Sequence, residues 1–257
     1  MAQEILVSRS GDIATVTLNR PEKRNALNPP MIELLSRTFD EVSADQSLRV
    51  VIVGAAGSAF CAGLDLTEMA KQREAGEADL GGLEELLEKI EACPHPTIAA
   101  VRGDAVAGGC ELSLHCDIRV AADDARFSMP LARIGLAVPV TLTWKLVDTI
   151  GIAKTNELLF TGEAVPAEAA VHLGMANRVV PADELDGAVD GLARQIAQNA
   201  PLSVRAMKAF IRRAASLRRS LARDDLEELH RQVRSSADLQ EGLAARREKR
   251  RPQFRGA

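Results

Sequence analysis

The stretch "TIAAVRGDAVAGGCELSLHCDIRVAA" (residues 97–122) decides how this chain folds. Residues 97–103 form a short apolar run that ends at a glycine, which is typical of a buried parallel strand. A similar run, "DIRVAA", occupies residues 117–122. Between them, the pair Gly108-Gly109 precedes small and apolar residues. The pattern therefore predicts a strand, a tight turn, a short helix and a second strand.

The same alternation continues on both sides of this stretch. Apolar and polar residues alternate over 13–18, as in a half-buried strand, and residues 49–54 form another buried apolar run. Apolar residues at helical spacing predict helices over 30–44 and roughly 82–92. After about residue 143 nearly every segment is helix-periodic, with 176–181 as the exception. Strands alternating with helices predict an α/β layered domain.

Composition limits the classes of partner. The 257 residues have a net charge of −4, and the aromatic residues are six Phe, one Trp and no Tyr. With so few rings for base stacking, we expect no nucleic-acid partner. The sequence has no signal-peptide pattern and no apolar run long enough to span a membrane, so we expect a cytoplasmic protein without membrane contacts. The four cysteines form no C-x-x-C pair and are expected to be reduced thiols, and no metal-ligand spacing occurs.

Two segments of the chain share a design that could bind a carbonyl oxygen. In "VVIVGAAGSAFCAGLDL" (50–66) and in residues 97–112, a buried strand enters a glycine-containing turn that begins a helix. Amides at a helix start have no partner within the helix, and small residues let a ligand approach the backbone. Two such turns together could offer two N–H donors to one oxygen on which charge develops. A phosphate loop is excluded, because Gly109-Cys110 stands where Lys and Ser or Thr are needed, and no G-x-S-x-G nucleophile turn is present.

Each residue of these turns also has a structural interpretation. Glu111 in the first turn of a helix is favourable for dipole reasons alone. The glycine pair could serve only to pack helix against strand. Asp65 could be an N-cap as readily as a ligand residue, and His115 is better explained as a core histidine with its hydrogen bonds made.

Five stretches in order along the chain resemble the enoyl-CoA hydratase/isomerase, or crotonase, family. They are "LNRPEKRNALN" (18–28), "AFCAGLDL" (59–66), "VAGGCELSLHCDIRVAADDARFSMP" (106–130), "LLFTGEAVPAEAAVHLGMANRVVP" (158–181) and "EGLAARREKRRPQF" (241–254). The resemblance implies the ClpP/crotonase-like α/β fold, a spiral of ββα units over residues 1–195. Residues 196–257 would then form a helical trimerisation region, giving a homotrimer or a dimer of trimers.

The resemblance also implies the site. The backbone N–H groups of Ala62 and Gly108 would form an oxyanion hole for an acyl-CoA thioester, and Glu111 would be the catalytic acid/base. The residues that would bind the acyl-CoA are Arg24, Ala26, Ala62, Gly63, Asp65, Leu66 and Leu131. No metal or other cofactor is implied, because CoA arrives as part of the substrate.

The family pattern is broken at a catalytic position. Leu131 occupies the place of the second catalytic glutamate of the hydratases, and leucine cannot transfer a proton. The sequence therefore predicts an enoyl-CoA hydratase-like lyase that relies on Glu111. The alternatives are an enoyl-CoA isomerase or acyl-CoA decarboxylase with one carboxylate, and a non-catalytic acyl-CoA-binding protein.

Overall fold

The structure is a computed structural model that describes residues 3–68, 71, 82–216 and 224–256. Its contacts divide the chain into two compact units. The first unit comprises Met1–Phe127 and Val165–Ala214, and the second comprises Ser128–Ala164 and Ala215–Ala257. The organisation expected from the resemblance, a core of residues 1–195 and a trimerisation region of 196–257, stays a prediction.

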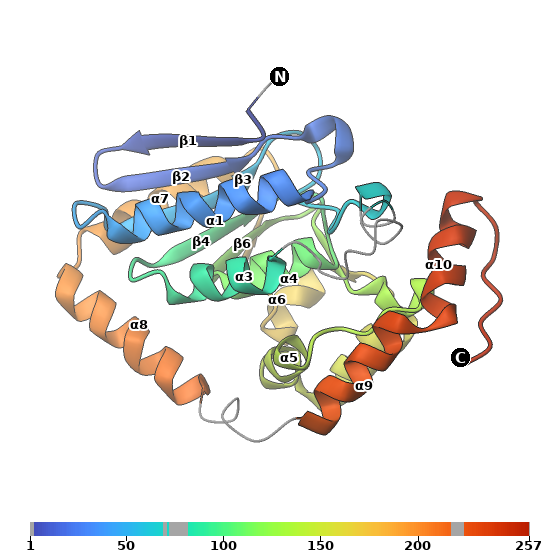
Figure 1. Cartoon of the computed structure of the whole chain (residues 1–257). Helices are drawn as coiled ribbons and strands as arrows, with labels where there is room; N and C mark the ends of the chain where they lie inside the picture. The colour runs from blue at the N-terminus through green and yellow to red at the C-terminus, as the bar shows by residue number, and fades with distance from the viewer. Residues whose placement is uncertain (1–2, 69–70, 72–81, 217–223, 257) are drawn as a thin grey trace. The chain divides into compact units, whose positions relative to one another are not determined.

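A six-stranded sheet forms the centre of the first unit, in the order β1-β2-β3-β4-β6-β9 (Figure 1). Its strands are β1 (Ile5–Ser10), β2 (Ile13–Leu18), β3 (Val50–Ala55), β4 (Thr97–Val101), β6 (Ile118–Ala122) and β9 (Arg178–Val180). All neighbours pair in parallel except β1 and β2, which form an antiparallel hairpin. The strands predicted over 13–18, 49–54, 97–103, 117–122 and 176–181 are thereby confirmed.

Strand β1 was not predicted from the sequence. Only Ile5 of its six residues is buried, and the other five are exposed. A strand with five of its six residues exposed has no buried face that would leave an apolar alternation in the sequence.

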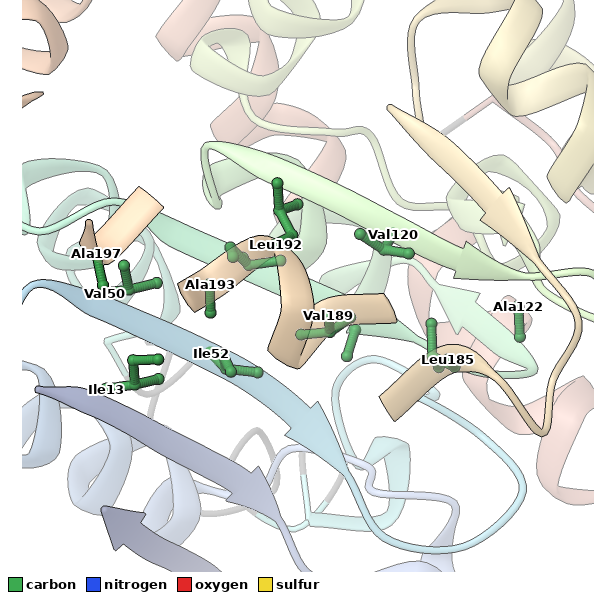
Figure 2. Packing of buried hydrophobic residues seen from close by; sticks show 12 residues of the cluster. Ile13, Val50, Ile52, Val120, Ala122, Leu185, Val189, Leu192, Ala193 and Ala197 are labelled. Carbon is green, nitrogen blue, oxygen red and sulfur yellow. The ribbon is translucent and has the colours of Figure 1, made fainter. Parts of the chain in front are cut away.

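Helix α7 (Leu185–Ala197) covers one face of the sheet. Figure 2 shows its residues Leu185, Val189 and Leu192 packed against side chains of the strands. The strand residues of this cluster are Ile13, Val50, Ile52, Ile98, Ala100, Val120 and Ala122. Because side chains alternate along a strand, their neighbours point to the opposite face, where α1 (Pro29–Ala44) and α3 (Leu83–Ala92) lie (Figure 1). Both faces are thus covered, as a parallel sheet requires.

Helix α4 (Gly108–His115) is buried at all eight residues. It contacts α3 and β5 (Asp104–Val106), and β5 pairs in a three-stranded sheet with β7 (Arg126–Ser128) and β8 (Val165–Pro166). The helix is short and buried on every side, so the fold encloses it together with its polar residues Glu111, Ser113 and His115. The predicted order of strand, tight turn, short helix and strand over 97–122 is confirmed, with β5 as an addition.

The remaining elements are mostly helical, as predicted for the chain after residue 143. In the first unit these are α6 (Ala167–Leu173) and α8 (Pro201–Ser216). The second unit contains η2 (Pro130–Ile134), α5 (Val140–Thr161), α9 (Asp224–Ser235) and α10 (Ala237–Arg247). In the part of the chain that the structure describes, no helix is both long enough and apolar enough to span a bilayer.

Candidate functional site

Three extended segments of the first unit lie side by side at the candidate site. The middle one contains Cys61 and Leu64, which form parallel bridges with Ala105 on one side and Leu27 on the other. Cys61 donates its N–H to the carbonyl of Asp104 at 3.1 Å, and Asp65 donates its N–H to the carbonyl of Leu27 at 2.8 Å. Residues 61–65 are therefore held from both sides by backbone hydrogen bonds.

Asn25 fixes the segment on the Leu27 side. It is fully buried and has a positive φ of 54°. Its side-chain amide donates to the carbonyls of Ala56 and Ala59, both at 2.8 Å, and its Oδ1 accepts the N–H of Arg20 at 2.8 Å. Asparagine tolerates this left-handed backbone better than most residues. Asn25 is a structural part of the site that was not predicted from the sequence. The available signal was an asparagine in the triplet Arg24-Asn25-Ala26, directly after the turn at Pro21.

Two glycines allow the two turns to touch through their backbones. A Cβ on Gly109 would lie 2.2 Å from the carbonyl oxygen of Cys61. A Cβ on Gly63 would lie 2.8 Å from the carbonyl oxygen of Val106 and 3.3 Å from the amide nitrogen of Gly108. Real side chains do not come that close, so only glycine fits at either position. The glycines therefore place residues 61–64 directly against the start of α4.

The backbone hydrogen bonds require a correction to the predicted oxyanion hole. Ala62 donates its N–H to the carbonyl of Arg24 at 3.0 Å, so this donor is already used within the protein. The structure thus speaks against Ala62 as a donor to substrate. Its role was carried over from a motif, and the motif does not reveal which way each amide points.

Leu64 supplies the free amide of this turn. Asp65 donates its N–H toward Leu27, and consecutive N–H groups of an extended segment point to opposite sides. The N–H of Leu64 therefore points to the side where Cys61 meets β5 and α4 begins. Its nitrogen lies 3.7 Å from where a Cβ on Gly108 would be. None of the described residues accepts a hydrogen bond from the N–H of Leu64 or Gly108.

The turn into α4 includes a strained residue. Ala107, directly before the helix, has φ 48° and ψ −118°. Residues other than glycine rarely adopt a positive φ, and the strain costs about 1–3 kcal/mol. This conformation allows the chain to leave β5 and begin α4 at Gly108 without a longer loop.

Glu111 lies in the first turn of α4 and is 4% exposed. Burial, assisted by the negative charge of Glu84, raises its pKa to about 8. No described residue donates a hydrogen bond or a salt bridge to its carboxyl group, whereas buried polar groups normally have such a partner. Glu111 is therefore a protonated, unpartnered acid near neutral pH, three residues after the free amide of Gly108.

The C-terminal end of α4 is held by two buried side chains. The guanidinium of Arg119 donates to the carbonyls of Cys116 at 2.6 Å and Ser113 at 3.3 Å, and also to Met175 at 2.7 Å. His115 Nδ1 lies 2.8 Å from the carbonyl oxygen of Glu111. The expectation that His115 is a buried histidine with a hydrogen-bond partner is confirmed.

Two of the residues predicted to bind CoA, Arg24 and Asp65, belong to the segments of this backbone cluster, and their side chains are already paired. Arg24 is exposed and forms a salt bridge with Asp104. Asp65 contacts Arg20 at 3.0 Å and accepts the N–H of Thr67 at 3.1 Å, which confirms its N-cap interpretation. Although partial burial opposes it, the Arg20 hydrogen bond and nearby backbone amides lower the pKa of Asp65.

The other predicted binding residues divide between the units. Ala26 and Leu66 are half-buried in the first unit, and Gly63 is the glycine of the contact described above. Leu131 is half-buried in η2 of the second unit. Their roles in binding acyl-CoA stay predictions.

No metal site is found within the described residues. They contain no group of three or more His, Cys, Asp or Glu side chains that could hold a metal ion. All four cysteines are buried and free, as predicted for reduced thiols. Burial raises the pKa of the Cys61 thiol to about 12, so this thiol is a poor nucleophile.

Comparison with known proteins gives the same family across the chain. The family model for enoyl-CoA hydratase/isomerase matches residues 8–257. A probable enoyl-CoA hydratase of Mycobacterium tuberculosis is 35% identical over 254 residues, covering 98% of both chains. The 2,3-dehydroadipyl-CoA hydratase of Escherichia coli is 33% identical over 256 residues, covering 98% of this chain and 99% of that protein.

Solved structures confirm the predicted crotonase fold. A methylmalonyl-CoA decarboxylase in complex with 2-nitronate-propionyl-CoA superimposes with a TM-score of 0.90 at 28% identity, covering 100% of both chains. An enoyl-CoA hydratase/carnithine racemase from Magnetospirillum magneticum has a TM-score of 0.77 at 37% identity, covering 100% of this chain and 97% of that one.

The contact at Gly109 predicts a large effect of a single methyl group. Gly109→Ala should reduce the free energy of unfolding by about 1–3 kcal/mol, since the Cys61 backbone cannot move away freely. It should also lower turnover at least about 100-fold by displacing the start of α4. Urea denaturation and steady-state kinetics measure the two effects.

The matched control is Gly191→Ala in α7, where a Cβ meets no atom within 4 Å. This change should stabilise the protein by about 0.5–1 kcal/mol, as expected for a helix interior. A Gly109→Ala protein as stable and active as wild type would show that the turns do not need this contact.

The raised pKa of Glu111 predicts a pH-dependent stability. An unfolded glutamate loses its proton near 4.5, whereas native Glu111 keeps it to about 8. Between these values the native state binds more protons, so stability falls as the pH rises. The free energy of unfolding of Glu111→Gln, relative to that of wild type, should rise by up to about 4 kcal/mol from pH 5 to pH 8. Denaturant unfolding at each pH measures it, and a constant difference would contradict the buried acid.

Proposed function

The chain belongs to the enoyl-CoA hydratase/isomerase family, and we propose that it is an enoyl-CoA hydratase-like enzyme in which Glu111 transfers the proton. The observation that supports this most is the position of a buried, protonated Glu111 three residues after the free amide of Gly108. The expected enzyme class, a lyase or isomerase, agrees with the family that matches residues 8–257.

In the proposed site, the thioester oxygen of the substrate accepts hydrogen bonds from the N–H groups of Leu64 and Gly108. These donors stabilise the negative charge that moves onto this oxygen when an enolate forms, and one such donor is typically worth about 10²–10³ in kcat. They belong to a rigid backbone cluster, so no reorganisation is needed during the reaction.

Glu111 then supplies a proton to the α-carbon of the enolate. Its pKa of about 8 keeps it protonated at neutral pH and keeps the pKa close to the working pH, which favours proton transfer in either direction. In hydration, the oxygen of water bonds to the β-carbon and releases one proton to solvent. The electrons of the C=C bond move toward the thioester, and the α-carbon takes the proton of Glu111.

An acyl-CoA decarboxylase is the second candidate, because a methylmalonyl-CoA decarboxylase superimposes with a TM-score of 0.90. Loss of CO₂ from a malonyl-type thioester leaves the same enolate, and a single acid is enough to protonate it. A 1,3-proton shift by an isomerase also needs only one proton-transfer group. Leu131, at the position where the family resemblance implies a second glutamate, is compatible with both reactions.

We propose no cofactor, since CoA enters with the substrate, and we propose a cytoplasmic homotrimer or dimer of trimers. The surface of α8 supports self-association. Its apolar residues Leu202, Met207, Phe210 and Ile211 are more than half exposed, while Lys208 forms a 2.7 Å salt bridge with Asp117 of the first unit. An amphipathic helix that binds its own unit through a basic side chain leaves its apolar face for another subunit.

Substrate preference can be determined with a panel of 2-enoyl, 3-enoyl and malonyl-type CoA thioesters in heavy water. The hydratase proposal expects 3-hydroxyacyl-CoA from the 2-enoyl substrate, with deuterium at the α-carbon. Glu111→Gln should lower this turnover about 10²–10⁴-fold with little change in KM, because the proton donor is lost while the amides remain.

Other outcomes identify the alternatives. If the malonyl-type substrate releases CO₂ and no substrate is hydrated, the protein is a decarboxylase and not a hydratase. Saturable binding of acyl-CoA without any product would indicate the non-catalytic protein, and Leu131→Glu should then create hydratase activity. Full turnover by Glu111→Gln would contradict the role of Glu111.

A further inference from the structure

In the proposed hydration, Glu111 is left as a carboxylate while the attacking water releases one proton. The carboxyl group of Glu111 has no hydrogen-bond partner within the described chain and the residue is 4% exposed, so a route that returns a proton to it is needed. Leu131 cannot supply it. A second proton-transfer group is therefore expected on one of the elements that pack on α4.

Helices α3 and α4 lie in matched register. The side chain of Leu83 at the start of α3 lies 3.2 Å from where a Cβ on Gly108 would be. Farther along both helices, Glu91 Oε2 lies 3.8 Å from His115 Nε2. The two helices thus run in the same direction, with the N-terminal end of α3 over the N-terminal end of α4.

This register places Glu84 near the first turn of α4. Residues 84 and 91 are two turns apart on α3, so they lie on one face of the helix. Since Glu91 on that face reaches His115, Glu84 on the same face lies toward the turn of α4 that contains Glu111. Glu84 is exposed, and its charge acts on Glu111.

We propose that Glu84 is the positioning residue of Glu111: it keeps Glu111 protonated and returns a proton to it after each turnover. The inference rests on the proposed function, in which Glu111 protonates the α-carbon. It names a side chain that takes the place of the missing second glutamate.

Glu111 breaks its O–H bond as the C–H bond forms at the α-carbon, and it is left as a carboxylate. Glu84 takes up one proton from solvent and passes it to Glu111, so both groups end in their starting state. In hydration, this proton equals the one that water releases when its oxygen bonds to the β-carbon.

Other groups near Glu111 do not fill this role. From α3, Glu91 faces His115, and from β5, Asp104 pairs with Arg24. On α4 itself, burial raises the pKa of the Cys110 thiol far above neutrality, so this thiol stays protonated. Glu84 is the exposed carboxylate among them that acts on Glu111.

The test compares Glu84→Gln with Glu85→Gln. Both glutamates are exposed and in the first turn of α3, but they differ in helical face. Among the described residues, the only ion pair of Glu85 is the one with Lys89 at 3.6 Å, which is exposed and of small energetic value. The titration of Glu111 is followed in the free enzyme by ¹³C NMR of protein labelled at the glutamate carboxyl carbons, with Glu111→Gln to assign the signal.

Removing the charge of Glu84 should lower the pKa of Glu111 by about 0.5 unit or more, since a like charge nearby disfavours ionisation. The alkaline limb of the pH profile of kcat should move to lower pH by the same amount. Turnover of Glu84→Gln should fall at least about 10-fold at pH 8 with KM unchanged, because resupply of the proton is also lost. Glu84→Asp should recover part of it, and Glu85→Gln should match wild type.

An unchanged Glu111 titration in Glu84→Gln would overturn the inference, and so would equal shifts in Glu84→Gln and Glu85→Gln. A shifted titration without the expected fall in kcat would also overturn it, because resupply of the proton would then not depend on Glu84. If wild type converts none of the thioester panel, the proposed function fails instead, and the titration still decides whether Glu84 and Glu111 form a pair.

Discussion

The site depends on a backbone contact between two turns that lie almost fifty residues apart in the sequence. Gly109 lies against the carbonyl of Cys61, and Gly63 lies against the carbonyl of Val106. Without side chains at these two positions, the start of α4 approaches residues 61–64 closely enough for two amides to face one ligand oxygen. Catalysis by these two amides requires the close approach of α4 to residues 61–64, because the donors are backbone groups that no rotamer change could bring together.

The surrounding fold keeps these turns in place. The parallel sheet is packed on both faces, so the ends of β3 and β4 have fixed positions. Asn25 binds the carbonyls of Ala56 and Ala59 before the first turn, and Arg119 binds the last carbonyls of α4. Strain at Ala107 is tolerated because the elements on either side of it are held in this way.

The sequence predicted the strands with buried faces, the α4 turn and the place of Glu111, because apolar runs and glycine pairs directly reflect burial and close approach. It missed β1, whose residues are mostly exposed. It also selected Ala62 instead of Leu64, since the direction of an amide depends on the positive φ of Gly63 and on pairing with Leu27. Glu84 could not be found from the sequence, because its relation to Glu111 arises only when α3 packs on α4.

The most direct test replaces single backbone amides by esters. Hydroxy-acid analogues placed at residues 62 and 64 remove one N–H each and leave the side chains unchanged. The ester at 64 should lower kcat about 10²–10³-fold with near-native stability. The ester at 62 should mainly weaken folding, by loss of the bond to Arg24. A protein with the ester at 64 that turns over substrate as fast as wild type would contradict the proposed pair of amides.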